Sequence, residues 1–260
     1  MTDAEGINLL VIDWDFFFPT VEHPSQGEDW QLYDWVHSEA RSPQLLAEIW
    51  RNRASDFFRA GRDLPGLSGQ QRNFWDRFTF TDDAVAYLAD SNRYAGAGDV
   101  RDDVTSVWLF DAHHDAGYRP GTAERVITEQ AVSCEDWMVA YHADDAALHV
   151  RYPTWRTHAF TIEPPPQVPV DRAFDDGGPV DVEFGRVFIC RSDHWVPPWL
   201  DADFEKFVAT APVAELVEGM WDEDGADIEL RDFDPAPAKA QAELFAKLLA
   251  DVQTMTRSSA

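Results

Sequence analysis

Cysteine and long apolar runs are scarce in this chain of 260 residues, and both shortages narrow the class of protein. The two cysteines, Cys134 and Cys190, are too few for a disulfide framework, and neither belongs to a C-x-x-C pair. No apolar stretch approaches the roughly 20 residues of a transmembrane helix. The first residues, MTDAEGINLL, lack the basic start of a signal peptide. We therefore expect a cytoplasmic protein that does not span a membrane.

Positive charge is scarce as well. The chain has 21 Lys and Arg residues against 48 Asp and Glu residues, which gives a formal net charge of −27. Such a charge repels the phosphates of nucleic acids, so we expect no nucleic-acid partner. It attracts cationic ligands, but a composition rich in Asp, Ala and Arg and poor in Lys is equally typical of proteins from GC-rich genomes. Charge by itself therefore favours a cationic substrate only weakly.

Strand-like and helix-like segments alternate along the chain. Runs of branched aliphatic and aromatic residues predict strands at 8–12, 107–110, 149–152 and 186–190. The alternation predicts a single α/β domain over residues 1–260, with three layers and a mostly parallel sheet that has helices on both faces. The expected helices lie at 29–40, from Pro43 to Gly61, from Thr81 to Leu88, from Ser133 to Tyr141, from Asp201 or Asp203, at 213–221 and from Pro237.

Polar clusters follow three of the predicted strands. In parallel sheets the carboxyl ends of the strands meet at one edge, where ligands bind. Carboxylates with imidazoles suit divalent ions such as manganese, zinc or iron. The same residue types also cap helices and close turns, so each cluster taken alone has a structural explanation. The candidate ligands are Asp13 and Asp15 after the first strand, Asp111, His113 and Asp115 after the second, and Asp193 with His194 after the last.

Five carboxylates at one sheet edge favour two cations over one. Like charges a few ångströms apart cannot all stay ionised without a counter-ion, and a single ion would leave several carboxylates unused. A pair of divalent ions about 3.5 to 4 Å apart can share bridging carboxylates and activate water. Next to these ligands, His114 is either a supporting group or an exposed side chain. Glu135 is either a contact for the substrate or an ordinary solvated helix N-terminus.

Three motifs resemble those of a known superfamily. Asp111-Ala112-His113-His114-Asp115 resembles the D-A-H-x-D signature of the arginase and histone-deacetylase superfamily. Ile12-Asp13-Trp14-Asp15, followed by Pro19, is similar to its D-x-D-x-x-D-P strand end. Ser192-Asp193-His194 is similar to the D-H segment that supplies a lone histidine ligand. Together the motifs cover about a tenth of the chain, and D-A-H-x-D is the most specific of them.

The resemblance implies a ligand set and a chemistry. Asp13 and Asp111 would bridge two divalent ions, expected to be Mn²⁺. Asp115 and His194 would complete one site, and His113 and Asp15 the other. The metal-bridging hydroxide would be the nucleophile, and it would be hydrogen-bonded to Asp115. The candidate catalytic residues beside the metals are Asp115, His114 and Glu135.

The sequence also departs from ordinary arginases. The D-x-D segment opens the chain instead of closing the motif order, and Phe18 stands at its third aspartate position. The loop that recognises the α-amino and α-carboxylate groups of free arginine is not recognisable after Asp115. These features resemble the atypical peptide arginases, so the resemblance implies hydrolysis of peptidyl arginine to ornithine and urea. The expected partner is an arginine-containing precursor peptide, and the oligomeric state stays open.

Three alternatives remain. Val11 to Asp15 also resembles the nucleophile strand of haloacid-dehalogenase-type phosphatases, with Ser192, Lys206 and the acidic run 222–224 in suitable order. An amide deacetylase of the same superfamily would use one metal ion and a tyrosine, for which Tyr118 and Tyr141 are candidates. A binding module could keep the fold without the chemistry and hold basic peptides on its acidic surface.

Overall fold

The structure is a computed structural model that describes residues 6–19, 43–157, 159–217 and 231–258. Contacts divide these residues into two compact units, which are described separately. None of the helices in the described ranges is both long and apolar enough to cross a membrane. Unit 1 comprises the described residues within Met1–Pro19, Leu67–Val196 and Ala202–Glu229, and unit 2 those within Thr20–Gly66, Pro197–Asp201 and Leu230–Ala260.

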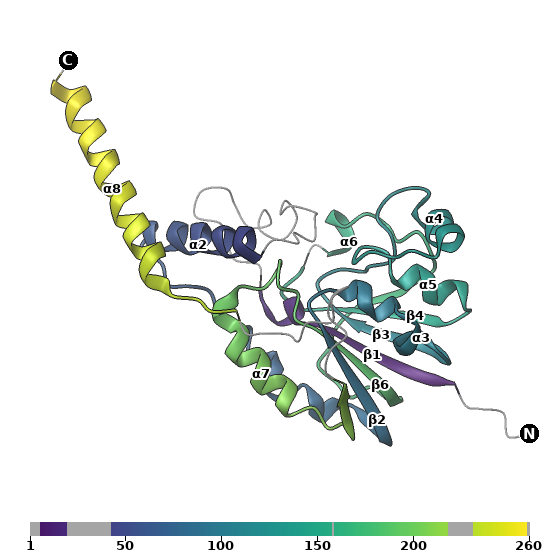
Figure 1. The fold of residues 1–260 in the computed structure, drawn as a ribbon. Coiled ribbons are helices and arrows are strands. Elements are labelled where there is room, and N and C mark those ends of the chain that lie inside the picture. Colours follow the sequence, from purple (N-terminus) through teal and green to yellow (C-terminus); the bar gives the residue numbers. More distant parts are fainter. Residues whose placement is uncertain (1–5, 20–42, 158, 218–230, 259–260) are drawn as a thin grey trace, which may run out of the picture. The chain divides into compact units, whose positions relative to one another are not determined.

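Unit 1 is built on a sheet of seven strands in the order β5-β4-β3-β1-β6-β2-β7 (Figure 1). Every pairing is parallel, so all carboxyl ends lie at the same edge. The prediction of a three-layer α/β fold with a mostly parallel sheet is confirmed. The strands are β1 (Ile7–Asp13), β2 (Thr79–Ala89), β3 (Val104–Phe110), β4 (Ala147–Tyr152), β5 (Asp171–Phe174), β6 (Glu183–Cys190) and β7 (Glu215–Val217).

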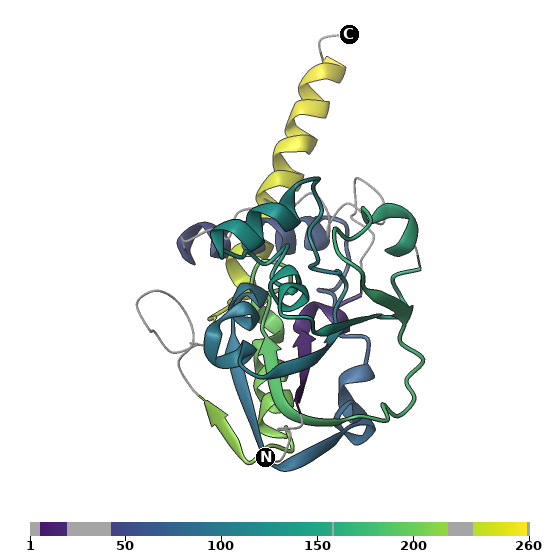
Figure 2. The same ribbon diagram turned by 90° about the vertical axis from the view of Figure 1, so that its right-hand side faces the viewer.

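The middle of the sheet is formed by the strands that the sequence marks most clearly. Leu9 to Ile12 of β1 are fully buried, as expected for a strand covered on both faces. β1 pairs with β3 on one side and β6 on the other, so segments about 100 and 180 residues along the chain become its neighbours. Figure 2 shows β1 in purple between these later strands.

The two faces of the sheet are covered differently. On one face Leu9, Val11 and the alternate residues of β3, β4 and β6 pack in a core of aliphatic and aromatic side chains beneath α3, α4 and α5. On the other face the rings of Phe74 and Phe110 lie 5.2 Å apart, and α7 contributes Phe207, which stacks on Trp75 at 4.7 Å. Mixed aliphatic and aromatic packing under the helices and mainly aromatic packing opposite hold the sheet between two layers.

Helices of two kinds, α and 3₁₀, connect and flank the strands. Those of unit 1 are η1 (Trp14–Phe17), η2 (Gln70–Asn73), η3 (Trp75–Arg77), η4 (Asn92–Gly96), α3 (Gly98–Arg101), α4 (Thr122–Glu129), α5 (Met138–Ala143), α6 (Ala159–Ile162) and α7 (Asp201–Ala209), where η marks a 3₁₀-helix and α7 belongs to unit 1 from Ala202 onward. Those of unit 2 are α2 (Pro43–Arg59), η5 (Pro198–Leu200) and α8 (Pro235–Ser258).

In unit 2 the two long helices α2 and α8 contact each other. Asn52 accepts a hydrogen bond from Gln241 at 2.8 Å, and the guanidinium of Arg59 lies 4.6 Å from the centre of the Phe245 ring. The helix starts expected at Pro43 and near Pro237 are confirmed. From Leu244 onward, α8 exposes several large apolar side chains: Leu244, Phe245, Leu248, Leu249, Val252 and Met255.

Two predicted helices are wrong. Thr81-Asp82-Asp83 indicates a helix start, yet these residues lie in strand β2, at a register irregularity between Phe80 and Val85. The local acidic signal is outweighed by pairing of β2 between β6 and β7, which only the assembled sheet provides. The helix expected at 213–221 is strand β7 at Glu215–Val217. The helix expected at 29–40 and most of the acidic stretch 222–235 lie outside the described residues.

Candidate metal centre

The carboxyl ends of four adjacent strands, β3, β1, β6 and β2, converge on one buried polar centre in unit 1. Asp13 is the last residue of β1, and Asp111 directly follows β3, whose Phe110 pairs with Ile12 of β1. Asn92 comes just after β2, and Ser192 just after β6. Parallel pairing therefore assembles residues that are up to 179 positions apart in the sequence.

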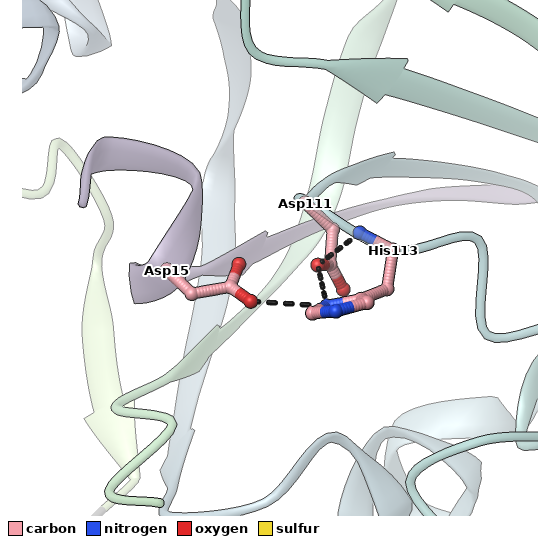
Figure 3. A group of neighbouring side chains, drawn as sticks. All are labelled: Asp15, Asp111 and His113. Carbon is pink, nitrogen blue, oxygen red and sulfur yellow. Dashed lines mark hydrogen bonds and ion pairs between the residues drawn. The ribbon is translucent and has the colours of Figure 1, made fainter. Parts of the chain in front are cut away.

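Asp15 and His113 form one side of this centre, which we call the histidine half. His113 Nδ1 lies 3.0 Å from Asp15 Oδ2 and 3.3 Å from Asp111 Oδ1. Figure 3 shows the three side chains pointing toward one another. Backbone amides fix both carboxylates, because Ala112 N donates to Asp15 Oδ1 at 3.2 Å and His113 N donates to Asp111 Oδ1 at 2.7 Å. One ligand atom from each of Asp15, Asp111 and His113 lies within 4.8 Å of the others, close enough to hold one ion.

Asp13, Asp115 and Asn92 form the other side, the carboxylate half. The amide nitrogen of Asn92 lies 2.7 Å from Asp13 Oδ2, 3.1 Å from Asp111 Oδ2 and 3.1 Å from Asp115 Oδ2. Three carboxylate oxygens from two segments, the end of β1 and the loop after β3, thus surround one atom. Asp111 belongs to both halves, since its Oδ1 faces His113 and its Oδ2 faces Asn92.

The electrostatics of the two halves differ. Burial raises the pKa of Asp13 and of Asp111 well above the usual range, and repulsion by the Asp15 carboxylate adds to this in both. Burial also raises the pKa of Asp115 to about 7, against the opposing effect of His113. Burial acts on Asp15 in the same direction, but the His113 imidazole and hydrogen bonds outweigh it, so the pKa of Asp15 is lowered.

The hydrogen-bond donors to Asp13 and Asp115 are neutral. Ser192 donates to Asp13 at 3.1 Å and the Trp137 indole donates to Asp115 at 2.8 Å, in addition to Asn92. In the described part of the chain no Lys or Arg side chain hydrogen-bonds to them. Buried carboxylates without a cationic partner are costly, and bound divalent cations relieve that cost. The donor set of carboxylates, an imidazole and an amide fits divalent metal ions.

The loop that carries Asp111, His113 and Asp115 is anchored by a second polar cluster beneath it. Glu163 is buried and accepts hydrogen bonds from Tyr118 Oη at 2.9 Å and from His114 N at 2.9 Å. It also accepts one from Tyr152 Oη. Tyr118 Oη in turn accepts from the backbone amides of His114 and Asp115, at 3.2 and 3.3 Å. Burial raises the pKa of Tyr118, and the negative Glu163 reinforces it, so the hydroxyl keeps its proton.

His114 supports this loop and does not face the ligands. Its ring is fully buried and stacks on Tyr118 at 4.2 Å. Nε2 lies 2.8 Å from the carbonyl oxygen of Pro164, which can only accept, so Nε2 carries the proton. Nδ1 accepts from the backbone amide of Ala116 at 3.0 Å. Burial lowers the pKa of His114, which keeps the ring neutral. The predicted catalytic role of His114 therefore gains no support from its contacts.

The segment after β6 borders the centre through residues other than the predicted histidine. Ser192 contacts Asp13, and the Trp195 ring lies 5.2 Å from the ring of His113. His194 places its Nδ1 2.6 Å from Oδ1 of its neighbour Asp193. Ligation by His194 stays a prediction, whereas Asp13, Asp15, Asp111, His113 and Asp115 are brought together as the motifs predicted.

Two residues that contact the carboxylate half have left-handed backbone conformations. Asp115 has φ 46° and Ser192 has φ 56°. Such conformations cost about 1 kcal/mol or more for residues other than glycine and are concentrated at functional sites. The Asp115 carbonyl accepts from Met138 N at 3.2 Å, which ties the strained residue to the start of α5. Glu135 contributes its backbone carbonyl to the same region, accepting from Gly117 N at 2.9 Å.

Asn92, Trp137 and Glu163 were not identified as site residues from the sequence. The sequence pattern does not single out Asn92, because it predicts a helix where strand β2 lies. A signal was present, since an apolar run ending in Asp90-Ser91-Asn92 matches the pattern of the other strand ends. Trp137 and Glu163 carry no local signal, because their contacts depend on loops folding back over the sheet edge.

Comparison of the chain with protein-family models, with curated proteins and with solved structures finds no match.

Proposed function

We propose that this chain is a dinuclear-metal guanidine hydrolase that converts arginine side chains of a peptide to ornithine and releases urea. The observation that carries the proposal is the position of Asp111. Its two oxygens face two different groups of ligands, His113 with Asp15 on one side and Asp13 with Asp115 on the other. A carboxylate in this position is suited to bridge two ions.

The chain supplies ligands of balanced charge. The two halves contain four carboxylates, Asp13, Asp15, Asp111 and Asp115, which offset the charge of two divalent ions when His113 is neutral. Such ions, when bound, lower the pKa of water toward about 7 and polarise the attacked carbon.

The reaction balances without a further reactant. Water adds to the guanidinium carbon, the bond between that carbon and the side-chain nitrogen breaks, and the proton passes to the leaving amine. The products are ornithine and urea. We assign the proton transfer to Asp115, because it is the ionisable group of the carboxylate half that is hydrogen-bonded to both Trp137 and Asn92.

The choice of an arginine side chain rests on the D-A-H-x-D resemblance, and that of a peptide on the loop after Asp115. This loop runs through Ala116, Gly117 and Tyr118. Gly117 N donates to Glu135, and Tyr118 Oη is engaged with Glu163, so both groups are used inside the protein. They are therefore not available to bind the α-amino and α-carboxylate groups of free arginine. The net charge of −27 favours approach of a cationic side chain.

The alternatives account for fewer contacts. A phosphatase of the haloacid-dehalogenase type needs a lysine beside Asp13, but the Lys206 amine is exposed on α7 and pairs with Asp203 at 3.1 Å. A deacetylase needs a tyrosine aimed at the substrate carbonyl. The Tyr118 hydroxyl donates to Glu163, and that of Tyr141 donates to the Ala95 carbonyl at 2.5 Å. A binding module without chemistry leaves the buried carboxylates unexplained.

The test is to incubate manganese-loaded protein with arginine-containing peptides and, separately, with free arginine. We expect each modified peptide to show the mass loss of an arginine-to-ornithine conversion together with stoichiometric urea, and excess chelator to abolish both. Turnover of free arginine without peptide modification would overturn the choice of substrate and leave guanidine hydrolysis standing. Protein that holds no metal after loading would overturn the proposal as a whole.

A further inference from the structure

Asn92 occupies a position that hydrogen bonding alone does not explain. Its amide nitrogen approaches three carboxylate oxygens, yet an amide nitrogen carries only two protons. At least one of the three contacts therefore lacks a proton. Asn92 is 3% exposed, so bulk solvent does not reach this contact.

The oxygen atom of the same carboxamide, Oδ1, also indicates that a binding partner is missing. Asn92 Oδ1 is buried and has no hydrogen-bond partner in the part of the chain that the structure describes. A buried acceptor without a partner costs about 1–3 kcal/mol, and such groups in native proteins call for an explanation, of which a bound ion is one. This oxygen is an observation independent of the carboxylates around it.

A half-turn about the Cβ–Cγ bond exchanges the two ends of the carboxamide. Nitrogen and oxygen of an asparagine side chain are nearly equal in size, and their assignment follows from the surroundings. After the turn, Oδ1 stands where Nδ2 stands now, at 2.7–3.1 Å from oxygens of Asp13, Asp111 and Asp115. Neighbouring oxygen ligands of an octahedral ion with bonds of about 2.1 Å are separated by about 3 Å. Oδ1 has no hydrogen bond to lose in the turn. The contacts that Nδ2 makes with the three carboxylates are given up, and a bound cation takes over their role of offsetting the negative charge.

We infer that Asn92 Oδ1 is a ligand of the cation held by the carboxylate half, together with Asp13, Asp111 and Asp115. The inference rests on the proposed function, which requires that cation. It assigns to Asn92 the place that sequence motifs gave to His194, whose Nδ1 lies against Asp193. In the cation-free protein the amide donates to the carboxylates, and in the loaded protein it coordinates.

The fold holds Asn92 in a fixed position. It is the first residue of η4, and Ser91 caps that helix by accepting from Arg93 N at 3.3 Å. The Tyr141 hydroxyl holds the same turn through the Ala95 carbonyl. A neutral oxygen here, in place of an imidazole, makes the carboxylate half an all-oxygen site. Oxygen ligands favour hard ions such as Mn²⁺ and Mg²⁺ over Zn²⁺.

The experiment compares Asn92→Leu, which has a similar size and no polar atom, with Asn92→Asp, which keeps an oxygen but loses the amide protons. Each variant and the wild-type chain is loaded with Mn²⁺ and desalted. Manganese per folded chain is then measured by mass spectrometry, and affinity by titration calorimetry. We expect two ions in the wild type and in Asn92→Asp. We expect one ion in Asn92→Leu, or a loss of affinity for the second ion of about 100-fold or more.

His194→Ala is the matched comparison, and we expect it to retain both ions. Two ions bound with wild-type affinity in Asn92→Leu would overturn the inference. So would a loss in Asn92→Asp as large as that in Asn92→Leu, because the amide protons would then be the important feature. Wild-type chain that binds no ion would instead overturn the proposed function. If circular dichroism shows that Asn92→Leu does not fold, Asn92→Ala replaces it under the same criteria.

Discussion

The two halves of the metal centre use the same residue type in opposite electrostatic states. In the histidine half the His113 imidazole outweighs burial and lowers the pKa of Asp15. In the carboxylate half burial dominates and raises the pKa of Asp13, and that of Asp115 reaches about 7. One imidazole at 3.0 Å decides the difference. Cation binding to the carboxylate half therefore releases protons.

The largest effect should come from Asp111, because it is the residue that both halves share. Asp111→Ala should lose both ions and reduce turnover by about a thousandfold or more, since several kcal/mol of transition-state stabilisation disappear with the metal pair. The measurements are manganese content and the rate of urea release. If Asp111→Ala retains both ions, the shared carboxylate is not a bridge.

His113→Ala tests whether the halves are separable. It changes only the histidine half, so one ion should remain in the carboxylate half. Asp171→Asn is the control for loss of a carboxylate as such, because Asp171 is exposed on β5 and pairs with Arg151 and His149. Its metal content and rate should equal those of the wild type. Equal losses in His113→Ala and Asp111→Ala would show that the halves act as one site.

A smaller effect should appear in the pH dependence of the metal-free protein. The pKa of Asp115 is about 7 in the folded chain against 3.8 for an ordinary aspartate, so the folded state holds the proton more tightly. Its contribution to the free energy of unfolding is complete below pH 3.8 and is lost as the pH rises through 7. Asp15 has a lowered pKa, so its contribution to the free energy of unfolding changes only in more acidic solution. His114 also has a lowered pKa, and its contribution to the free energy of unfolding is lost as the pH falls, in the opposite direction to that of Asp115.

Comparison with Asp115→Asn separates these contributions. We expect chelator-treated wild-type protein to lose more stability between pH 5 and pH 8 than Asp115→Asn does, as measured by urea unfolding. Saturating Mn²⁺ should reverse the trend, because the ions bind the ionised carboxylates. Parallel pH profiles for the two metal-free proteins would contradict the raised pKa of Asp115.

The smallest effect should come from Glu163, which touches neither half. Glu163→Gln replaces one acceptor oxygen by an amide that cannot accept from Tyr118 or Tyr152, and it should cost about 1–3 kcal/mol of stability. Because Glu163 and Tyr118 hold the backbone of the metal-binding loop, manganese affinity should fall about tenfold. Glu205→Gln on the exposed face of α7 is the matched control. Wild-type affinity in Glu163→Gln would limit this cluster to stability.

Sequence patterns predicted the central strands and the ligands that directly follow them. β1, β3 and β6 carry apolar runs that stand out in isolation, and Asp13 and Asp111 come directly after two of them. β2 was misinterpreted because Thr81-Asp82-Asp83 is a strong local helix signal placed at a bulge. The loss of β2 removed Asn92 from consideration, so one error in secondary structure became an error in the site.

The sequence by itself determined the parallel α/β architecture and the five acidic and imidazole side chains at its edge, because burial on two faces requires continuous apolar runs and these side chains follow them. Only the tertiary structure decided how those side chains divide into a histidine half and a carboxylate half. The approach of His113 to Asp15, the insertion of Asn92 among three carboxylates and the support of Glu163 all depend on strand order and on loops meeting across the sheet edge. Distances of that kind are set by the packing of segments remote in sequence, and no local pattern encodes them.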